Sequence, residues 1–362
     1  MTALLLALTL GVAFANGAND VSKGIATLAG AGVTDLRRAL RWGTAWTVAG
    51  GVAAAFAAQG LVAVFSGRGM LVRETADPAF LAAVAVGALG WLIIATRTGL
   101  PVSTTHALVG GLVGSGIAAA GIAGVRWEAV AAKAALPLAL SPLVSLALML
   151  AVFPVIRLAL PRLNRYCLCL ERTDSVALVT VGSASAALAG GPSLRVVAGD
   201  ACPPEPVARL NAMDSLHWLT SGFTSFARGL NDTPKILALG AAAAVGTGLP
   251  TPWLFALVAL AMGAGSFWWG RRVTETLACR VSRISPDNGF AANLVTSALV
   301  GLASTLALPV STTHVSTGAI VGAGVHGRSV QWRVVRELML AWVVTLPVAA
   351  VLAGAAYAVI GS

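Results

Sequence analysis

Ten stretches of the chain are apolar and long enough to cross a lipid bilayer as helices, and they constrain the fold more than any other feature. They lie near residues 3–28, 43–66, 79–96, 105–124, 134–158, 214–240, 252–270, 288–306, 313–326 and 336–360. Hydrophobic residues make up 57% of the 362 residues and charged residues 10%, a balance that a soluble domain does not need. The sequence therefore predicts an all-α, multi-pass protein of the cell (inner) membrane.

The net charge of +10 arises largely from arginines in short connections between the apolar stretches. Clusters lie at 37–41, 157–172, 271–283 and 328–336. Basic clusters of this kind are typical of membrane-protein loops that face the cytoplasm, so we interpret the charge as topology and not as nucleic-acid binding. Ten crossings with both termini outside would place all four clusters on the cytoplasmic side.

Two motifs occur twice, in the same order, in the two halves of the chain. Pro-Val-Ser-Thr-Thr-His stands at 101–106 and, letter for letter, at 309–314. Asn-Asp-x-x-Lys stands at 19–23 and again at 231–235. The repetition indicates two homologous halves.

Five crossings in each half would invert the second half relative to the first, as in many secondary transporters with a site at the bilayer midplane. We expect a first transmembrane repeat over 1–160 and a second over 212–362, with broken or re-entrant helices at the motifs. A cytoplasmic insert or linker over 161–211 separates them, in which 175–181 and 193–197 are expected as short strands.

Three of the four cysteines, Cys167, Cys169 and Cys202, stand in this insert. A metal clip or a redox site would need a second close pair or a nearby histidine, which the spacing does not supply. We therefore expect reduced thiols, and the sequence indicates no cofactor.

Two of the three lysines in the chain, Lys23 and Lys235, occupy equivalent places in the repeat, beside Asp20 and Asp232. An ionised side chain inside a membrane costs at least ~2.5 kcal/mol on insertion scales, so such groups face a polar cavity or one another. A structural Asp-Lys pair on one helical face is one interpretation. Duplication of so unfavourable a feature favours a functional site, and the two interpretations are compatible.

Amide and carboxylate oxygens at these motifs suit a hard cation, and adjacent helix-breaking residues would expose backbone carbonyls there. Gly17 and Gly24 serve this purpose in the first motif, and Gly229 and Pro234 in the second. An anion near aspartates needs a cation or a proton between them, which predicts coupling to Na⁺ or H⁺. The candidate cation-coupling residues are Asn16, Asn19, Asp20, Asn231 and Asp232.

Pro-Val-Ser-Thr-Thr-His has the composition of a helix start, with a proline and capping hydroxyls before apolar helix formers. The free N–H groups and the positive dipole end of such a start favour an anion. Two starts brought together would surround one tetrahedral oxyanion, whereas ordinary capping of two re-entrant helices is the plainer alternative. The candidate substrate-binding residues are Ser103, Thr104, Thr105, Ser311, Thr312, Thr313, Lys23 and Lys235. His106 and His314 follow the two starts, and we favour a role in orienting the turn over a proton relay.

At these residues the chain resembles the inorganic phosphate transporter family, the sodium- or proton-coupled phosphate permeases. The family's Gly-Ala-Asn-Asp and Gly-x-Asn-Asp motifs match 17–20 and 229–232, and its two Pro-Val-Ser-Thr-Thr-His motifs match 101–106 and 309–314. The resemblance implies inverted repeats around a central phosphate and cation site, and often a homodimer.

Asn293 stands where many members of that family have Glu, and Lys23 where many have a small residue or Asn. Both differences make the site more positive, which suits a divalent oxyanion and leaves the cation stoichiometry open. Arg97 and Arg228 also lie near the motifs, without an assigned role.

The sequence therefore predicts a symporter that imports inorganic phosphate with Na⁺ or H⁺ by alternating access. A permease for sulfate or another tetrahedral oxyanion is the alternative, because sulfate shares the shape and charge of doubly ionised phosphate. An uncoupled anion channel would need a continuous polar pore. An enzyme is not expected, because Thr104 and His106 lack a third, orienting residue and no nucleotide-binding loop occurs.

Overall fold

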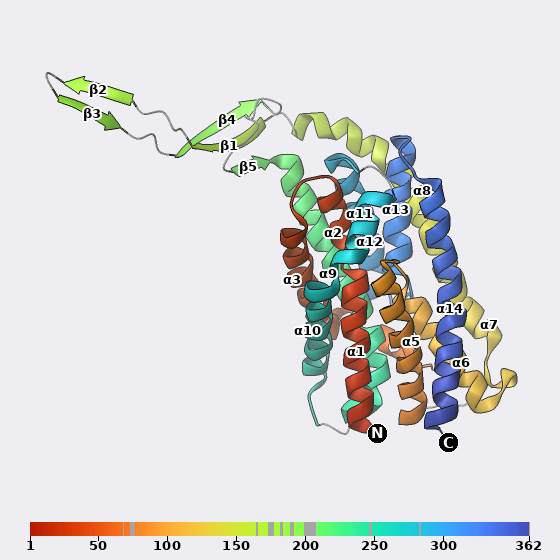
Figure 1. The fold of residues 1–362 in the computed structure, drawn as a ribbon. Helices are drawn as coiled ribbons and strands as arrows, with labels where there is room; N and C mark the ends of the chain where they lie inside the picture. The colour runs from red at the N-terminus through yellow and green to blue at the C-terminus, as the bar shows by residue number, and fades with distance from the viewer. Residues whose placement is uncertain are drawn as a thin grey trace.

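The computed structural model describes residues 1–67, 69–72, 77–163, 166–172, 177–181, 184–188, 192–198, 208–245, 248–281 and 284–361. Long helices in this part of the chain form a bundle, and short strands project beyond one end of it (Figure 1). The N- and C-termini lie together at the opposite end.

The first part of the bundle is built from helices up to residue 163. They are α1 (Thr2–Asp20), α2 (Ser22–Gly30), α3 (Leu36–Ala57), α4 (Gly60–Phe65), α5 (Pro78–Thr98), α6 (Thr104–Ala120), α7 (Trp127–Val130) and α8 (Leu136–Leu163). A 3₁₀ turn (Ile122–Gly124) and a π-helical turn (Ala131–Ala135) flank α7. The second part contains α9 (Ala212–Val245), α10 (Thr251–Trp269), α11 (Arg271–Arg280), α12 (Pro286–Thr305), α13 (Thr312–His326) and α14 (Trp332–Ile360).

Each of the ten apolar stretches falls on helical residues, and α11 adds a helix in the arginine-rich segment that was expected as a connection. Five helical stretches of the described chain are long and apolar enough to cross a membrane. They are Thr2–Gly30, Pro78–Thr98, Trp127–Ala159, Thr251–Trp269 and Trp332–Ile360. Large apolar side chains on α8 and α14, such as Leu158 and Val343, are exposed on the outside of the bundle. Such a surface suits lipid, and the protein is a multi-pass membrane protein.

The segment between α8 and α9 contains strands, so the expectation of an all-α chain holds for the bundle and not for this insert. The strands are β1 (Tyr166–Arg172), β2 (Ala177–Val181), β3 (Ala184–Leu188), β4 (Pro192–Ala198) and β5 (Ala208–Asn211). They form an antiparallel sheet in the order β4-β1-β5 and a β2-β3 hairpin. The strand predicted at 193–197 lies within β4, and the described part of the strand predicted at 175–181 coincides with β2. Residues 175 and 176 lie outside the described residues.

The prediction of reduced thiols in the insert stays a prediction. Cys167 and Cys169 lie on β1, whereas Cys202 lies outside the described residues. Cys279, on α11, is free and exposed. Within the described residues, no group of three or more His, Cys, Asp or Glu residues is arranged to hold a metal ion.

Helices α1 and α10 pack closely enough that a glycine is required on each of them. A Cβ atom added at Gly17 would overlap the backbone of Met262, and one added at Gly265 would overlap the backbone of Phe14. Small residues allow this approach, as in other membrane helix pairs. The contact fixes the part of α1 that carries the first Asn-Asp motif.

The first motif interrupts its helix, as predicted. Helix α1 ends at Asp20 and α2 begins at Ser22. The carbonyl oxygen of Asn19 instead accepts hydrogen bonds from Ser22 Oγ at 2.9 Å and from Lys23 Nζ at 3.3 Å. The freed carbonyl therefore becomes part of the polar cluster described below.

The corresponding prediction for the second motif is wrong, because α9 continues without a break through Pro234. A proline removes one N–H from the helical ladder, and neighbouring helices in a membrane protein can compensate for that loss. Helix α9 packs against both α3 and α12, so neighbouring helices that can compensate are present.

Both copies of the six-residue motif start a helix, as predicted. Ser103 caps α6 by accepting a hydrogen bond from the N–H of His106 at 3.2 Å. Ser311 caps α13 in the same way, with the N–H of His314 at 3.3 Å. Serine is among the preferred capping residues because its hydroxyl satisfies one of the free N–H groups of the first turn.

Candidate functional site

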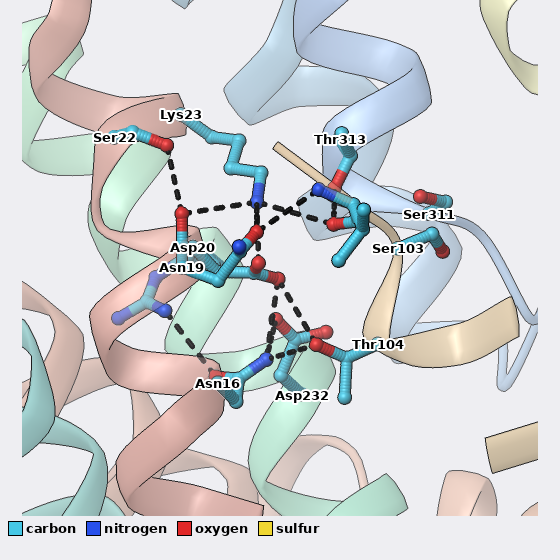
Figure 2. Close-up of polar contacts among 12 residues, drawn as sticks. Asn16, Asn19, Asp20, Ser22, Lys23, Ser103, Thr104, Asp232, Ser311 and Thr313 are labelled. Carbon is cyan, nitrogen blue, oxygen red and sulfur yellow. Dashed lines mark hydrogen bonds and ion pairs between the residues drawn. The ribbon is translucent and has the colours of Figure 1, made fainter. Parts of the chain in front are cut away.

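Asn16 joins the two repeated motifs at a buried point between α1 and α9 (Figure 2). Its amide nitrogen lies 3.2 Å from Oδ2 of Asp20 and 3.3 Å from Oδ2 of Asp232. It also donates to Oγ1 of Thr104, the first residue of α6, at 2.9 Å. None of these four side chains is more than 3% exposed. The carboxylates of the two repeated motifs therefore belong to one hydrogen-bonded cluster.

The asparagine of each Asn-Asp motif anchors the segment that leads into the capped helix of the same half. The Asn19 side chain donates to the carbonyl of Leu100 at 2.9 Å and accepts from the N–H of Val102 at 3.0 Å. The Asn231 side chain donates to the carbonyl of Val310 at 3.3 Å. Each Asn-Asp motif thus positions one of the two helix starts.

The starts of α6 and α13 are locked to each other by reciprocal contacts. Oγ1 of Thr105 donates to the carbonyl of Val310 at 3.4 Å. Oγ1 of Thr313 donates to the carbonyl of Val102 at 2.8 Å. The two helix starts therefore lie side by side, and their positive ends converge on the cluster around Asn16.

Five charged side chains are buried among the described residues, and three of them are cationic. Lys23 forms an ion pair with Asp20, and Lys235 lies 3.5 Å from Oδ1 of Asp232. Arg228 supplies the third cation and is 1% exposed. Three cations against two carboxylates leave one excess positive charge, which a buried anion would neutralise.

The two histidines stack behind the helix starts. The ring centroids of His106 and His314 are 4.7 Å apart, with 19° between the ring planes. Nδ1 of His314 lies 2.6 Å from the capping hydroxyl of Ser311. This contact suits the turn-orienting role predicted for His314, whereas the buried Nδ1 of His106 has no hydrogen-bond partner within the described residues.

All thirteen residues predicted for the site are buried, with exposed fractions of 4% or less. Twelve of these thirteen residues take part in the hydrogen bonds of the helix starts, the Asn16 cluster or the two lysines. The exception is Thr312, which is buried at the first position of α13. A cavity of about 500 Å³ is lined by residues of α4, α9 and α10, including Val62 and Phe255. Another of about 660 Å³ borders α8 and α14. The chemistry of the cluster, and not cavity size, makes it the candidate site.

The model of the phosphate transporter family matches residues 16–353 of the chain, a range that includes both copies of both motifs. The chain belongs to the phosphate transporter family. A candidate phosphate permease of Pyrococcus horikoshii is 30% identical, with 99% of this chain and 97% of that protein aligned. A candidate low-affinity inorganic phosphate transporter of Rhizobium meliloti is 26% identical, over 98% and 94% of the two chains.

A solved structure described as the sodium-dependent phosphate transporter has the same fold. The two superpose with a TM-score of 0.78 and 22% identity, covering 99% of this chain and 98% of the other. The likeness extends over the whole length of this member of the phosphate transporter family.

Sequence reasoning assigned no role to Arg228, which the structure places in the cluster. Its Nη1 donates to Oδ1 of Asn16 at 3.3 Å, and its Nη2 donates to Oγ1 of Thr47 at 2.8 Å. An arginine within an apolar stretch, three residues before Asn231, was the signal that pointed to it. Other polar neighbours that the sequence analysis missed are Thr47, Thr96, Ser266 and Ser304.

Two other residues noted in the sequence lie apart from the cluster around Asn16. Asn293 donates to Oγ1 of Thr27 at 2.8 Å, in a separate buried polar group near His217. Arg97 is exposed in the last turn of α5, with its guanidinium 5.8 Å from the ring centroid of Trp269.

Proposed function

We propose that this member of the phosphate transporter family is a symporter that imports inorganic phosphate with Na⁺ or H⁺ by alternating access. The observation that carries the proposal is the pair of capped helix starts, locked together beside a buried cluster with one excess positive charge. A tetrahedral, doubly charged anion suits such a place, because N–H groups and hydroxyls can surround it from two sides.

The two kinds of motif would bind ions of opposite charge. Hydroxyls at the starts of α6 and α13 would donate to the oxyanion, and Lys23 and Lys235 would supply positive charge beside it. The Asn-Asp pairs would hold positive charge close to their carboxylates. Asn16 contacts Asp20, Asp232 and Thr104 together. A change in the charge of the carboxylates would therefore alter the hydrogen bonds of Thr104 at the anion site.

The burial of the site supports alternating access between two inverted repeats, 1–160 and 212–362. An ion cannot reach side chains that are 4% exposed or less unless the helices around them move. Helix α1 runs from the end that holds the termini toward the end with the strands, whereas α9 starts near β5 and runs the opposite way (Figure 1). Opposed directions of the two motif-bearing helices are what inverted repeats require.

Uptake of radiolabelled phosphate into proteoliposomes tests this function. We expect accumulation to require an imposed Na⁺ or pH gradient, and a tenfold excess of unlabelled sulfate to leave most of it intact. Sulfate uptake without phosphate uptake would identify a sulfate permease. Uptake that depends on neither the Na⁺ gradient nor the pH gradient would indicate a channel and contradict the proposal.

A further inference from the structure

The ammonium group of Lys23 lies in a cage of oxygen atoms (Figure 2). It donates to Oδ1 of Asp20, to the carbonyl of Asn19 at 3.3 Å and to Oδ1 of Asn19 at 3.1 Å. The carbonyl of Val102, just before the first helix start, lies 3.4 Å away. These ligands are one carboxylate, one side-chain amide and two backbone carbonyls.

The ammonium group of Lys235 lies in a similar cage in the second half. It donates to the carbonyl of Val310 at 2.7 Å, to Oγ1 of Thr105 at 3.0 Å and to Oδ1 of Asp232 at 3.5 Å. The ring centroid of Phe65 lies 5.5 Å from the same nitrogen. Both lysines thus stand between an Asn-Asp motif and the backbone that leads into a helix start.

Carboxylate, amide and carbonyl oxygens at the break of a membrane helix are also the ligands that transporters offer to a coupling Na⁺. In this chain Lys23 already occupies such oxygens at the first motif, and Lys235 occupies a carboxylate, a hydroxyl and a backbone carbonyl at the second. A Na⁺ at either motif would share those oxygens with an ammonium group, in a cluster that already has one excess positive charge. The residues present therefore do not fit a Na⁺ at these two places.

We propose that Lys23 and Lys235 are resident cations that take the place of Na⁺ at the two Asn-Asp motifs, so that phosphate transport by this chain does not require Na⁺. The inference rests on the proposed function and narrows it, because the proton remains as the driving ion of the two considered. It also separates this chain from the sodium-dependent transporter whose fold it shares.

Phosphate uptake into proteoliposomes at a fixed pH gradient, with Na⁺ replaced by choline, tests the proposal in the wild-type protein. We expect the rate to change by less than about twofold, whereas a coupled Na⁺ site would make it fall by about tenfold or more. A fall of that size in the wild-type protein overturns the proposal, and this arm depends on no variant.

The variants Lys23→Ala and Lys235→Ala open one cage each, and Lys133→Ala is the matched control because Lys133 is exposed, in the π-helical turn that precedes α8. Without its ammonium group, each cage is expected to bind Na⁺. Na⁺ between about 1 and 200 mM should then raise the unfolding temperature of either variant by several degrees, because a ligand of the native state stabilises it. The wild-type protein and Lys133→Ala should show no such rise relative to choline.

The outcomes separate this proposal from the function on which it rests. A Na⁺-dependent rise in the wild-type protein, or folded cage variants that show none, would contradict the resident-cation proposal. A wild-type protein that takes up no phosphate under any gradient would contradict the proposed function, and the thermal measurement would still decide whether Na⁺ binds.

Discussion

Replacing Asp232 by Asn is expected to reduce phosphate uptake by at least about 100-fold, because a buried charge that loses its partner is disfavoured by several kcal/mol. Asp232 accepts hydrogen bonds from the side chains of Asn16, Asn231 and Lys235. Without this carboxylate, three buried cations would face the single carboxylate of Asp20. The charge balance that allows an anion to bind and leave would then be lost.

Uptake per reconstituted molecule is the measurement, with the elution profile of the detergent-solubilised protein as the check on folding. Asp20→Asn is expected to have the same effect, because Asp20 occupies the equivalent place in the first half. Glu275→Gln makes the same chemical change at an exposed carboxylate on α11, paired with Arg271, and should leave uptake unchanged. Normal uptake by both aspartate variants would show that the cluster is not the transport site.

Replacing Thr104 by Val is expected to raise the KM for phosphate by about 10-fold or more, because a hydrogen bond to a charged group contributes about 1.5–3 kcal/mol. The change removes a hydroxyl and keeps the shape of the side chain. That hydroxyl accepts from Asn16 at 2.9 Å and lies 3.5 Å from Oδ2 of Asp20. It therefore stands where the helix start meets the carboxylates, the place proposed for the anion.

The concentration dependence of initial uptake rates measures this effect. Thr98→Val is the matched control, because Thr98 is exposed and its hydroxyl donates to the carbonyls of Ile94 and Ala95 within α5. A KM for Thr104→Val within about twofold of the wild-type value would show that the Thr104 hydroxyl does not bind the anion. A twofold change corresponds to only about 0.4 kcal/mol.

Local features of this fold could be predicted from the sequence because their causes are local. The capping serines Ser103 and Ser311 follow from residue type and position. The interruption after Asp20 follows from the glycines and the clustered polar residues around it. Burial of the repeated aspartates and lysines follows from their place inside apolar stretches.

Contacts between distant parts of the chain could not be predicted in the same way. The bonds from Asn16 to Asp232 and from Arg228 to Thr47 join helices that are far apart in sequence, and only the packing of the bundle brings them together. The continuity of α9 through Pro234 likewise depends on helices packed against it. The Asp-Lys pairing was one interpretation of the sequence, but the contacts of each ammonium group with a carbonyl just before a helix start were not predictable from it.

Equilibrium binding of radiolabelled phosphate to the purified protein tests most directly whether both halves of the chain build one phosphate site. Thr104→Val and Thr312→Val alter equivalent positions in the two halves. One shared site predicts a single phosphate per wild-type chain, with its affinity lowered by either substitution. Two phosphates per chain, or binding that loses only half its capacity in each variant, would show two independent sites and contradict the account.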